Sequence, residues 1–412
     1  MLETNTTPVW TERRTPAYRR ISIALFLAGF ATFSLLYCVQ PLLPEFAADF
    51  HVSAAESSLA LSLSTALLAL TVLCSGALSE SLGRRGLMFA SLCAASVLTL
   101  VASLVPGWHA LLVVRALVGA SLGGVPAVAM AYLAEEIHPK GLGYAMGLYV
   151  GGTAFGGMFG RVATGILTEA VSWRFALGTF GIVNLAVAAG FILLLPPSRN
   201  FIRFPGPGIR HHLDAWGGHL RHRALPLLFL AGFLAMGAFV TIYNYLGFRL
   251  TSPPYNLNQM QIGLIFVVYL FGMIASPSAG ACADRFGRGP VLIAGALFSI
   301  TGIALTTAGP LYIIITGIIF LTIGFFVSHS VASAWVGRMA TAAKGHASSL
   351  YLLAYYVGSS VMGSMGGWFW SHDGWTAVAL FAGTMPVILL VAAIRLQTLA
   401  LRAAKEAKPP AP

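Results

Sequence analysis

The sequence predicts an all-α membrane protein with twelve transmembrane helices in two similar halves of six. Of the 412 residues, 57% are hydrophobic and only 9% are charged, whereas soluble domains carry roughly 25% charged residues. A ten-residue stretch, GALSESLGRR at 76–85, recurs loosely as GACADRFGRG at 280–289, which is 204 residues later. One motif repeated at half the chain length indicates a duplicated architecture.

Long apolar segments position the helices, since about 20 apolar residues span the hydrocarbon layer. We expect tails at 1–20 and 397–412, six-helix halves at 21–195 and 225–396, and a linker at 196–224. The expected spans are 21–44, 58–79, 86–106, 110–133, 143–166, 172–195, 225–248, 260–282, 290–308, 311–335, 347–369 and 375–396.

Basic residues orient the bundle. When the spans alternate from a cytoplasmic N-terminus, 20 of the 24 Lys and Arg residues fall on the cytoplasmic side. This bias is typical of cytoplasmic loops, so both termini are expected in the cytoplasm. The net charge of +11 therefore requires no nucleic-acid partner.

The linker contains a histidine-rich segment, HHLDAWGGHLRHRALP, which predicts a short amphipathic helix on the cytoplasmic face. Its side chains could suggest a metal site, but a basic surface linker near anionic headgroups explains them better. We expect no metal. The histidines and the acid are His211, His212, Asp214, His219 and His222.

The repeated motif keeps the pattern Gly-x-x-x-acid-x-x-Gly-Arg and is suited to a gate. Its acids can accept hydrogen bonds from a helix N-terminus in the opposite half, where the helix dipole is positive. The alternative is that its arginines only signal topology. The gate residues are Gly76, Glu80, Gly83, Arg84 and Arg85, and Gly280, Asp284, Arg285, Gly287 and Arg288.

Matches elsewhere pair the fifth span with the eleventh at an offset of 202 residues, as in Gly156 with Gly358 and Trp173 with Trp375. Two parallel halves related by an axis along the membrane normal would produce this pattern.

These features resemble a major facilitator superfamily transporter of the twelve-span proton-antiporter branch. Stretches such as LLYCVQPLLPEF, AYLAEEIHPKG and KGHASSLYLLAYYVGSS are most similar to bacterial inner-membrane proteins described as sugar (arabinose-type) efflux transporters. The resemblance implies alternating access in the inner membrane by a monomer among lipids, with a small-molecule substrate, coupled protons and no cofactor.

The same resemblance implies a cytoplasmic contact in the outward-facing state. Glu80 would meet the start of the eleventh span near Gly345, and Asp284 the start of the fifth near Gly141. Ser81 stands where the family has a basic residue, so the first contact is expected to be the weaker.

Two arginines fall within spans, where a cation needs a partner or a cavity. Arg115, in RALVGASLGGVP, resembles the family's coupling arginine, and we expect Glu45 at the end of the first span as its partner. Snorkelling to the outer headgroups is the alternative. Arg161, in the fifth span, replaces the proline of the antiporter motif and adds a second cation.

Three glycines of the same motif, Gly147, Gly156 and Gly160, keep its spacing and predict close helix packing against the other half.

No acidic residue falls deep within a span. Proton coupling is therefore expected to use Glu45 or Glu169 paired with an arginine, His329 in the tenth span, or protons carried by the substrate. A lone histidine between two serines also suits a hydrogen-bonded packing role.

Polar aromatic residues are the candidates for the substrate cavity, because rings with hydroxyl tips suit sugars or planar drugs. Tyrosines near span ends also fit the interfacial belt. The candidates are Tyr37, Gln40, Tyr149, Tyr243, Asn244, Tyr245, Tyr269 and Tyr355.

The predicted function is secondary active transport, with export of a sugar-like or drug-like molecule in exchange for protons. The alternative is an organic-anion exchanger or symporter that uses Arg115 and Arg161. A receptor or an enzyme is the remote alternative, because no catalytic constellation or cluster of metal ligands is visible in the sequence.

Overall fold

The computed structural model describes residues 10–201, 209–340 and 343–406, and these are almost entirely helical. The N-terminal half contains α1 (Pro16–Tyr37), the 3₁₀ turn η1 (Gln40–Leu42), α2 (Leu43–Phe50), α3 (Ala54–Leu82), α4 (Arg84–Ala102), α5 (Trp108–Leu122), α6 (Pro126–Glu136), α7 (Pro139–Ala170) and α8 (Trp173–Leu194).

The linker contributes α9 (Ile209–Leu220). The C-terminal half contains α10 (Leu225–Thr251), α11 (Gln259–Ile265), η2 (Phe266–Val268), α12 (Tyr269–Phe286), α13 (Arg288–Leu305), α14 (Leu311–Met339) and α15 (Lys344–Glu406).

The predicted all-α membrane fold is confirmed. Ten helical stretches of the described chain are long and apolar enough to cross a membrane. One of them, α15, is divided at Asp373 and Gly374, whose backbone is not helical, and so supplies two spans. The twelfth span is the 32-residue α7. It is not among the ten stretches, because its many glycines lower its mean hydropathy.

Three of the expected spans are broken. The first is interrupted between α1 and α2 by η1, where Pro41 and Pro44 lack the N–H group that a continuous helix needs. The fourth divides before Pro126, at the start of α6. The eighth comprises α11, η2 and α12. The break in the first span brings Gln40 to the interface between the halves.

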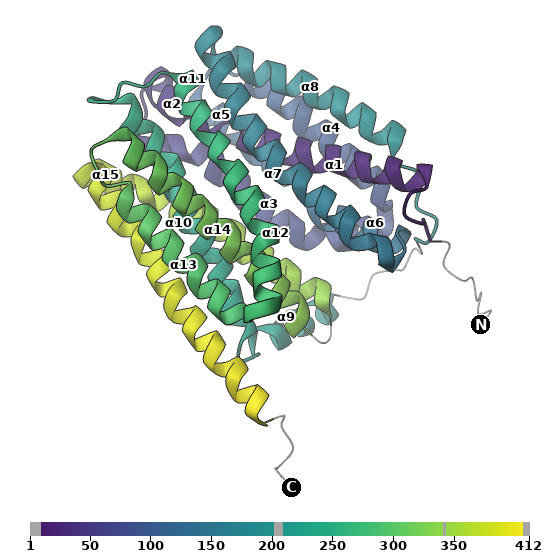
Figure 1. The fold of residues 1–412 in the computed structure, drawn as a ribbon. Coiled ribbons are helices and arrows are strands. Elements are labelled where there is room, and N and C mark those ends of the chain that lie inside the picture. The colour runs from purple at the N-terminus through teal and green to yellow at the C-terminus, as the bar shows by residue number, and fades with distance from the viewer. Residues whose placement is uncertain (1–9, 202–208, 341–342, 407–412) are drawn as a thin grey trace, which may run out of the picture.

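The two halves lie side by side and diverge toward one end (Figure 1). We call the end with the start of α1, α9 and the last residues of α15 the tail end, and the end with α2 and α11 the far end. Backbone meets backbone at the far end, where a Cβ on Gly165 of α7 would lie 2.8 Å from Cα of Gly263 on α11. Nearer the centre, Ser360 of α15 donates a hydrogen bond to the carbonyl of Ser62 on α3, at 2.8 Å.

The glycines of α7 pack mainly within their own half, which corrects the prediction that they contact the other half. A Cβ on Gly156 would lie 2.3 Å from the carbonyl oxygen of Phe30 on α1, and one on Gly160 would lie 2.9 Å from Cα of Ser34. Around Gly147 there is open space within 4 Å. The expected role in packing therefore does not apply to Gly147 in this structure.

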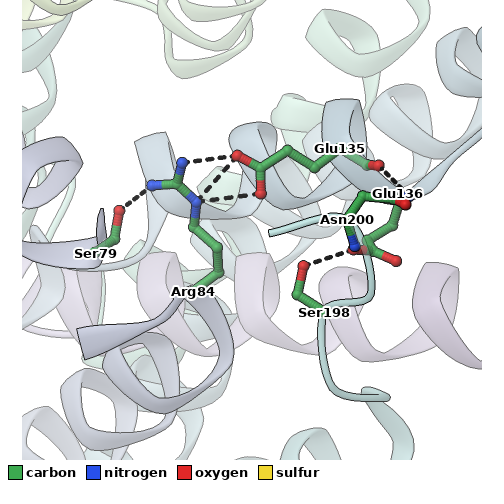
Figure 2. A network of polar contacts seen from close by, with 6 residues as sticks. All are labelled: Ser79, Arg84, Glu135, Glu136, Ser198 and Asn200. Carbon is green, nitrogen blue, oxygen red and sulfur yellow. Dashed lines mark hydrogen bonds and ion pairs between the residues drawn. The ribbon is translucent and has the colours of Figure 1, made fainter. Parts of the chain in front are cut away.

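The start of the linker is fastened to the N-terminal half (Figure 2). One carboxylate oxygen of the buried Glu136 accepts hydrogen bonds from the Ser198 hydroxyl and from the backbone N–H groups of Arg199 and Asn200, at 2.5 to 2.9 Å. Farther along, α9 forms where a short helix was predicted. Its His212 lies 2.8 Å from His346 at the start of α15.

Candidate functional site

The centre of the interface between the halves contains a buried arginine. Arg161, on α7, retains 2% of its surface exposed. Its Nε donates to the side-chain oxygen of Gln40 at 2.6 Å, and its Nη1 donates to the carbonyl of Gly157 one turn earlier, also at 2.6 Å. The helix break in the first span thus supplies one of its two hydrogen-bond partners.

Three aromatic rings surround this guanidinium. Its Cζ lies 4.1 Å from the ring centre of Tyr37, 4.8 Å from that of Tyr269 and 5.2 Å from that of Phe266. Such contacts stabilise a cation by about 0.5 to 2 kcal/mol each. Tyr37 belongs to the N-terminal half and the other two rings to the C-terminal half, so the cation lies where the halves meet.

A second polar link joins the halves beside the arginine. Gln40 donates from its amide nitrogen to the side-chain oxygen of Asn244 on α10, at 2.8 Å. Tyr243, next to Asn244, shares a hydrogen bond with Thr322 and stacks on Phe266. We refer to Tyr37, Gln40, Arg161, Asn244, Phe266 and Tyr269 as the central site.

Polar atoms in the central site remain without partners. The hydroxyls of Tyr37 and Tyr269 and the amide nitrogen of Asn244 are buried and have no hydrogen bond in the described chain. Buried polar groups are usually satisfied, because leaving one unpaired costs about 1 to 3 kcal/mol. Unpaired hydroxyls beside a cation make this place a candidate ligand site.

The predicted cavity residues divide between this site and other places. Tyr37, Gln40, Asn244 and Tyr269 are members, and Tyr243 is an immediate neighbour. Two others lie elsewhere: Tyr245 donates to the carbonyl of Gly363 between α10 and α15, and Tyr149 packs near Gly29 of α1. Tyr355 borders the site, because its hydroxyl interacts electrostatically with those of Tyr37 and Tyr269, and its ring centre lies 4.7 Å from that of His329.

Arg115 has a different environment from the one predicted. It is fully buried, and its three nitrogens donate to the carbonyls of Ala60, Leu35 and Leu36, at 3.2, 3.1 and 2.7 Å. The last two lie in the final turn of α1, where carbonyls have no helical partner and the dipole is negative. The prediction that Glu45 is the partner of Arg115 is therefore wrong for this structure.

Glu45 instead belongs to a contact between the halves at the far end. Its carboxylate accepts a hydrogen bond from the amide nitrogen of Gln259, the first residue of α11, at 2.9 Å. The carboxylate of Glu169 accepts from the backbone N–H of the same residue at 3.0 Å. We call these three residues the far-end contact. Sequence analysis did not identify Gln259 as a contact residue. The segment Asn-Gln-Met-Gln was a signal that a helix starts there, with Gln259 as its first residue.

His329 lies on α14 within the C-terminal half. Its Nδ1 is 2.9 Å from the hydroxyl of Tyr351, and its ring lies on Phe325 and Tyr355. This environment resembles that of a hydrogen-bonded packing residue.

The two motif copies form matching turns at the tail end. Gly83 and Gly287 both have positive φ, 87° and 91°, at the junctions before α4 and α13, a conformation that favours glycine. Arg84 pairs with Glu135 of α6 at 2.7 Å and also contacts Ser79 (Figure 2), while Arg85 donates to the carbonyl of Ile192. Gly76 and Glu80 belong to α3, and the Glu80 side chain lies outside the described part of the chain.

The second copy stays within its own half. Asp284 is 68% exposed and lies 3.7 Å from Arg288 and 3.5 Å from Arg338. Arg285 lies beside the ring of Phe286. At the start of α7, the carbonyl of Gly141 accepts a hydrogen bond from Tyr18. The contact between Asp284 and α7, expected for the outward-facing state, is not made here.

Two bundles of six spans that enclose a polar centre define a multi-pass membrane transporter. The model of the Major Facilitator Superfamily matches residues 25–255 and 247–412. The chain belongs to this superfamily, and it is a transporter rather than an enzyme.

Curated relatives agree over nearly the whole length. The chain is 46% identical to the inner membrane transport protein YnfM of Escherichia coli over 93% of this chain and 92% of that protein. It is 45% identical to the MFS-type transporter YybF of Bacillus subtilis, over 93% and 94% of the two chains.

Solved structures share the fold at low sequence identity. A bacterial homologue of the human lysosomal transporter Spinster, in an inward-facing and unoccupied conformation, has a TM-score of 0.73 and 16% identity, and the match covers 96% of this chain and all of the other. The nucleoside transporter NupG has a TM-score of 0.76 and 13% identity, over 91% and 99% of the two chains.

Proposed function

We propose that the chain exports a small molecule across the bacterial inner membrane by alternating access, as a monomer, in exchange for protons. The central site between the halves supports this function, because a ligand there contacts both halves and can be exposed by turns to each side. The tail end would face the cytoplasm. With the halves joined at the far end, this structure then corresponds to the inward-facing state.

The far-end contact is the best candidate for proton coupling. Glu45 and Glu169 act as acceptors toward Gln259, and a carboxylate accepts hydrogen bonds better when it is ionised. Protons arriving from outside would weaken this contact and let the far end open. Arg115 would stabilise the end of α1, where the first span breaks, by hydrogen bonds to its carbonyls. His329 would stabilise the packing of the C-terminal half.

Inside-out membrane vesicles from an overproducing strain test this function. They are energised by respiration, which acidifies their lumen, and are incubated with a metabolite extract that is then followed by mass spectrometry. We expect at least one compound to accumulate only with the protein present and only until a protonophore is added. Accumulation that resists the protonophore would contradict proton coupling, and accumulation only in right-side-out vesicles would reverse the direction.

Exchange or symport of organic anions is the second candidate. It is favoured because no carboxylate among the described residues forms an ion pair with Arg161. Arg115 no longer supports it, because its donors are occupied by carbonyls. The two candidates are separated by comparing accumulation of an organic anion in energised inside-out vesicles with its exchange in unenergised vesicles loaded with a second anion.

A further inference from the structure

We propose that Arg161 binds the carboxylate of the transported molecule, and that this molecule is an organic monocarboxylate with an aromatic body. The inference rests on the proposed transport function and names the chemical class of its cargo.

The two buried arginines are satisfied to different degrees. All three nitrogens of Arg115 donate to backbone carbonyls. Arg161 uses only Nε and Nη1, and no acceptor for its Nη2 is found in the described chain. Among the described residues, no Asp or Glu forms an ion pair with it. A buried cation without a counter-ion is costly, so the site favours an anion.

The neighbouring polar groups favour the same ligand. Tyr37 and Tyr269 both lie over the guanidinium, and the hydroxyls of both are buried without partners. Each hydroxyl can donate one hydrogen bond, whereas a carboxylate only accepts and has about four acceptor positions. One carboxylate therefore has enough acceptor positions for Nη2 and both hydroxyls. A sugar hydroxyl would leave the charge uncompensated.

The rest of the surroundings limits the remainder of the ligand. Phe266 lies over the guanidinium, and Phe239 stacks on Phe325 close to Tyr243. Aromatic rings prefer to pack against other rings. A second carboxylate would find no second cation here, because Arg161 is the one arginine in contact with these rings within the described residues. An aromatic monocarboxylate fits both conditions.

The alternative is that Arg161 only joins helices, through Gln40, Gly157 and the three rings. This role predicts a loss of thermal stability in Arg161 variants but no discrimination between an acid and its amide. Binding that depends on the charge of the ligand therefore separates the two roles.

The test measures thermal unfolding of the full-length protein in detergent with benzoate, phenylacetate and cinnamate, and with the amide of each acid and with benzylamine. We expect at least one acid to raise the melting temperature of the unmodified protein, with no effect of its amide or of benzylamine. Arg161→Gln should lose the response. Arg161→Lys should bind at least about tenfold more weakly, because ammonium lacks the planar fork that matches a carboxylate.

Arg249→Gln is the matched control. Arg249 also lies against aromatic rings and donates to a carbonyl, but it does so at the far end, with Trp375 and Ala308. This variant should respond to the acid as the unmodified protein does. If Arg161→Gln does not fold, Tyr37→Phe removes one hydroxyl alone and should weaken acid binding several-fold.

Three results would overturn the assignment: no response to any acid, equal responses to acid and amide, or an Arg161→Gln variant that binds within twofold of the unmodified protein. Acid binding without transport in vesicles would contradict the proposed function and the role of the acid as cargo, but would leave Arg161 as a carboxylate-binding residue. Vesicle transport confined to uncharged compounds would contradict the carboxylate assignment and leave the proposed transport function standing.

Discussion

The far-end contact makes a quantitative prediction about the balance between the two states of the transporter. The variant Glu45→Ala/Glu169→Ala removes both acceptors of Gln259, which bond across the halves at 2.9 and 3.0 Å. A hydrogen bond to a charged group contributes about 1.5 to 3 kcal/mol. Because Glu169 is exposed and Glu45 half-buried, we assign about that range to the pair together.

Removing this energy should shift the population toward the state with an open far end. Since 1.4 kcal/mol corresponds to a tenfold change in an equilibrium constant, the shift is about 10- to 150-fold. Spin labels on Ala170 of the N-terminal half and Asn256 of the C-terminal half, in a background without native cysteines, report the distance by electron paramagnetic resonance. We expect the longer distance to become populated.

Glu56→Ala is the matched control for this measurement. Glu56 is also a far-end carboxylate, but its hydrogen bonds go to Ser53 at the start of its own helix, within one half. It should leave the distance distribution unchanged. The reasoning fails if the double variant keeps the original distribution, or if the control shifts it equally.

Three further predictions follow from the same structure. Asp284→Asn should slow transport at least about tenfold with normal membrane levels, because the charge that would hold the outward-facing state is lost; normal turnover in vesicles would contradict this. Arg115→Lys should not restore the activity lost in Arg115→Ala, because one ammonium cannot follow three carbonyls in a fixed fork; full activity would refute it. Gly156→Val should lower the melting temperature and Gly147→Val should not, since only Gly156 meets the α1 backbone; equal losses would refute this.

Composition and periodicity were sufficient to predict the fold. Lipid requires long apolar helices with internally satisfied backbones, so spans are visible as apolar segments whatever their neighbours. The repeated glycines Gly83 and Gly287 were visible as well, and both take the positive φ that favours glycine. What composition could not determine was the form of the bend near Pro41 and Pro44, which is a 3₁₀ turn followed by the separate helix α2.

The site was harder to predict because its contacts join residues far apart in the chain. Arg115 was matched with Glu45 on the basis of charge. Backbone carbonyls at the end of α1 are equally good acceptors, and they cannot be recognised from the sequence because every residue has one. Gln259 escaped notice because an uncharged side chain at a helix start usually serves only its own helix. The ring of Phe266 beside Arg161 depends on the 3₁₀ turn η2.

The hydrogen bond between Gln40 and Asn244 has a consequence for how the duplicated halves diverged. These residues are 204 positions apart, the same interval that separates the two motif copies, so the bond joins equivalent places across the internal two-fold axis. By the 202-residue offset of the seventh and fifteenth helices, the counterpart of Arg161 is Gly363. A Cβ there would lie 3.1 Å from the unpaired amide nitrogen of Asn244. The fold therefore has two equivalent positions at which a cation could lie, and only one of them carries an arginine. Because the charge lies on one side of the internal two-fold axis, a ligand that binds it has a single preferred orientation.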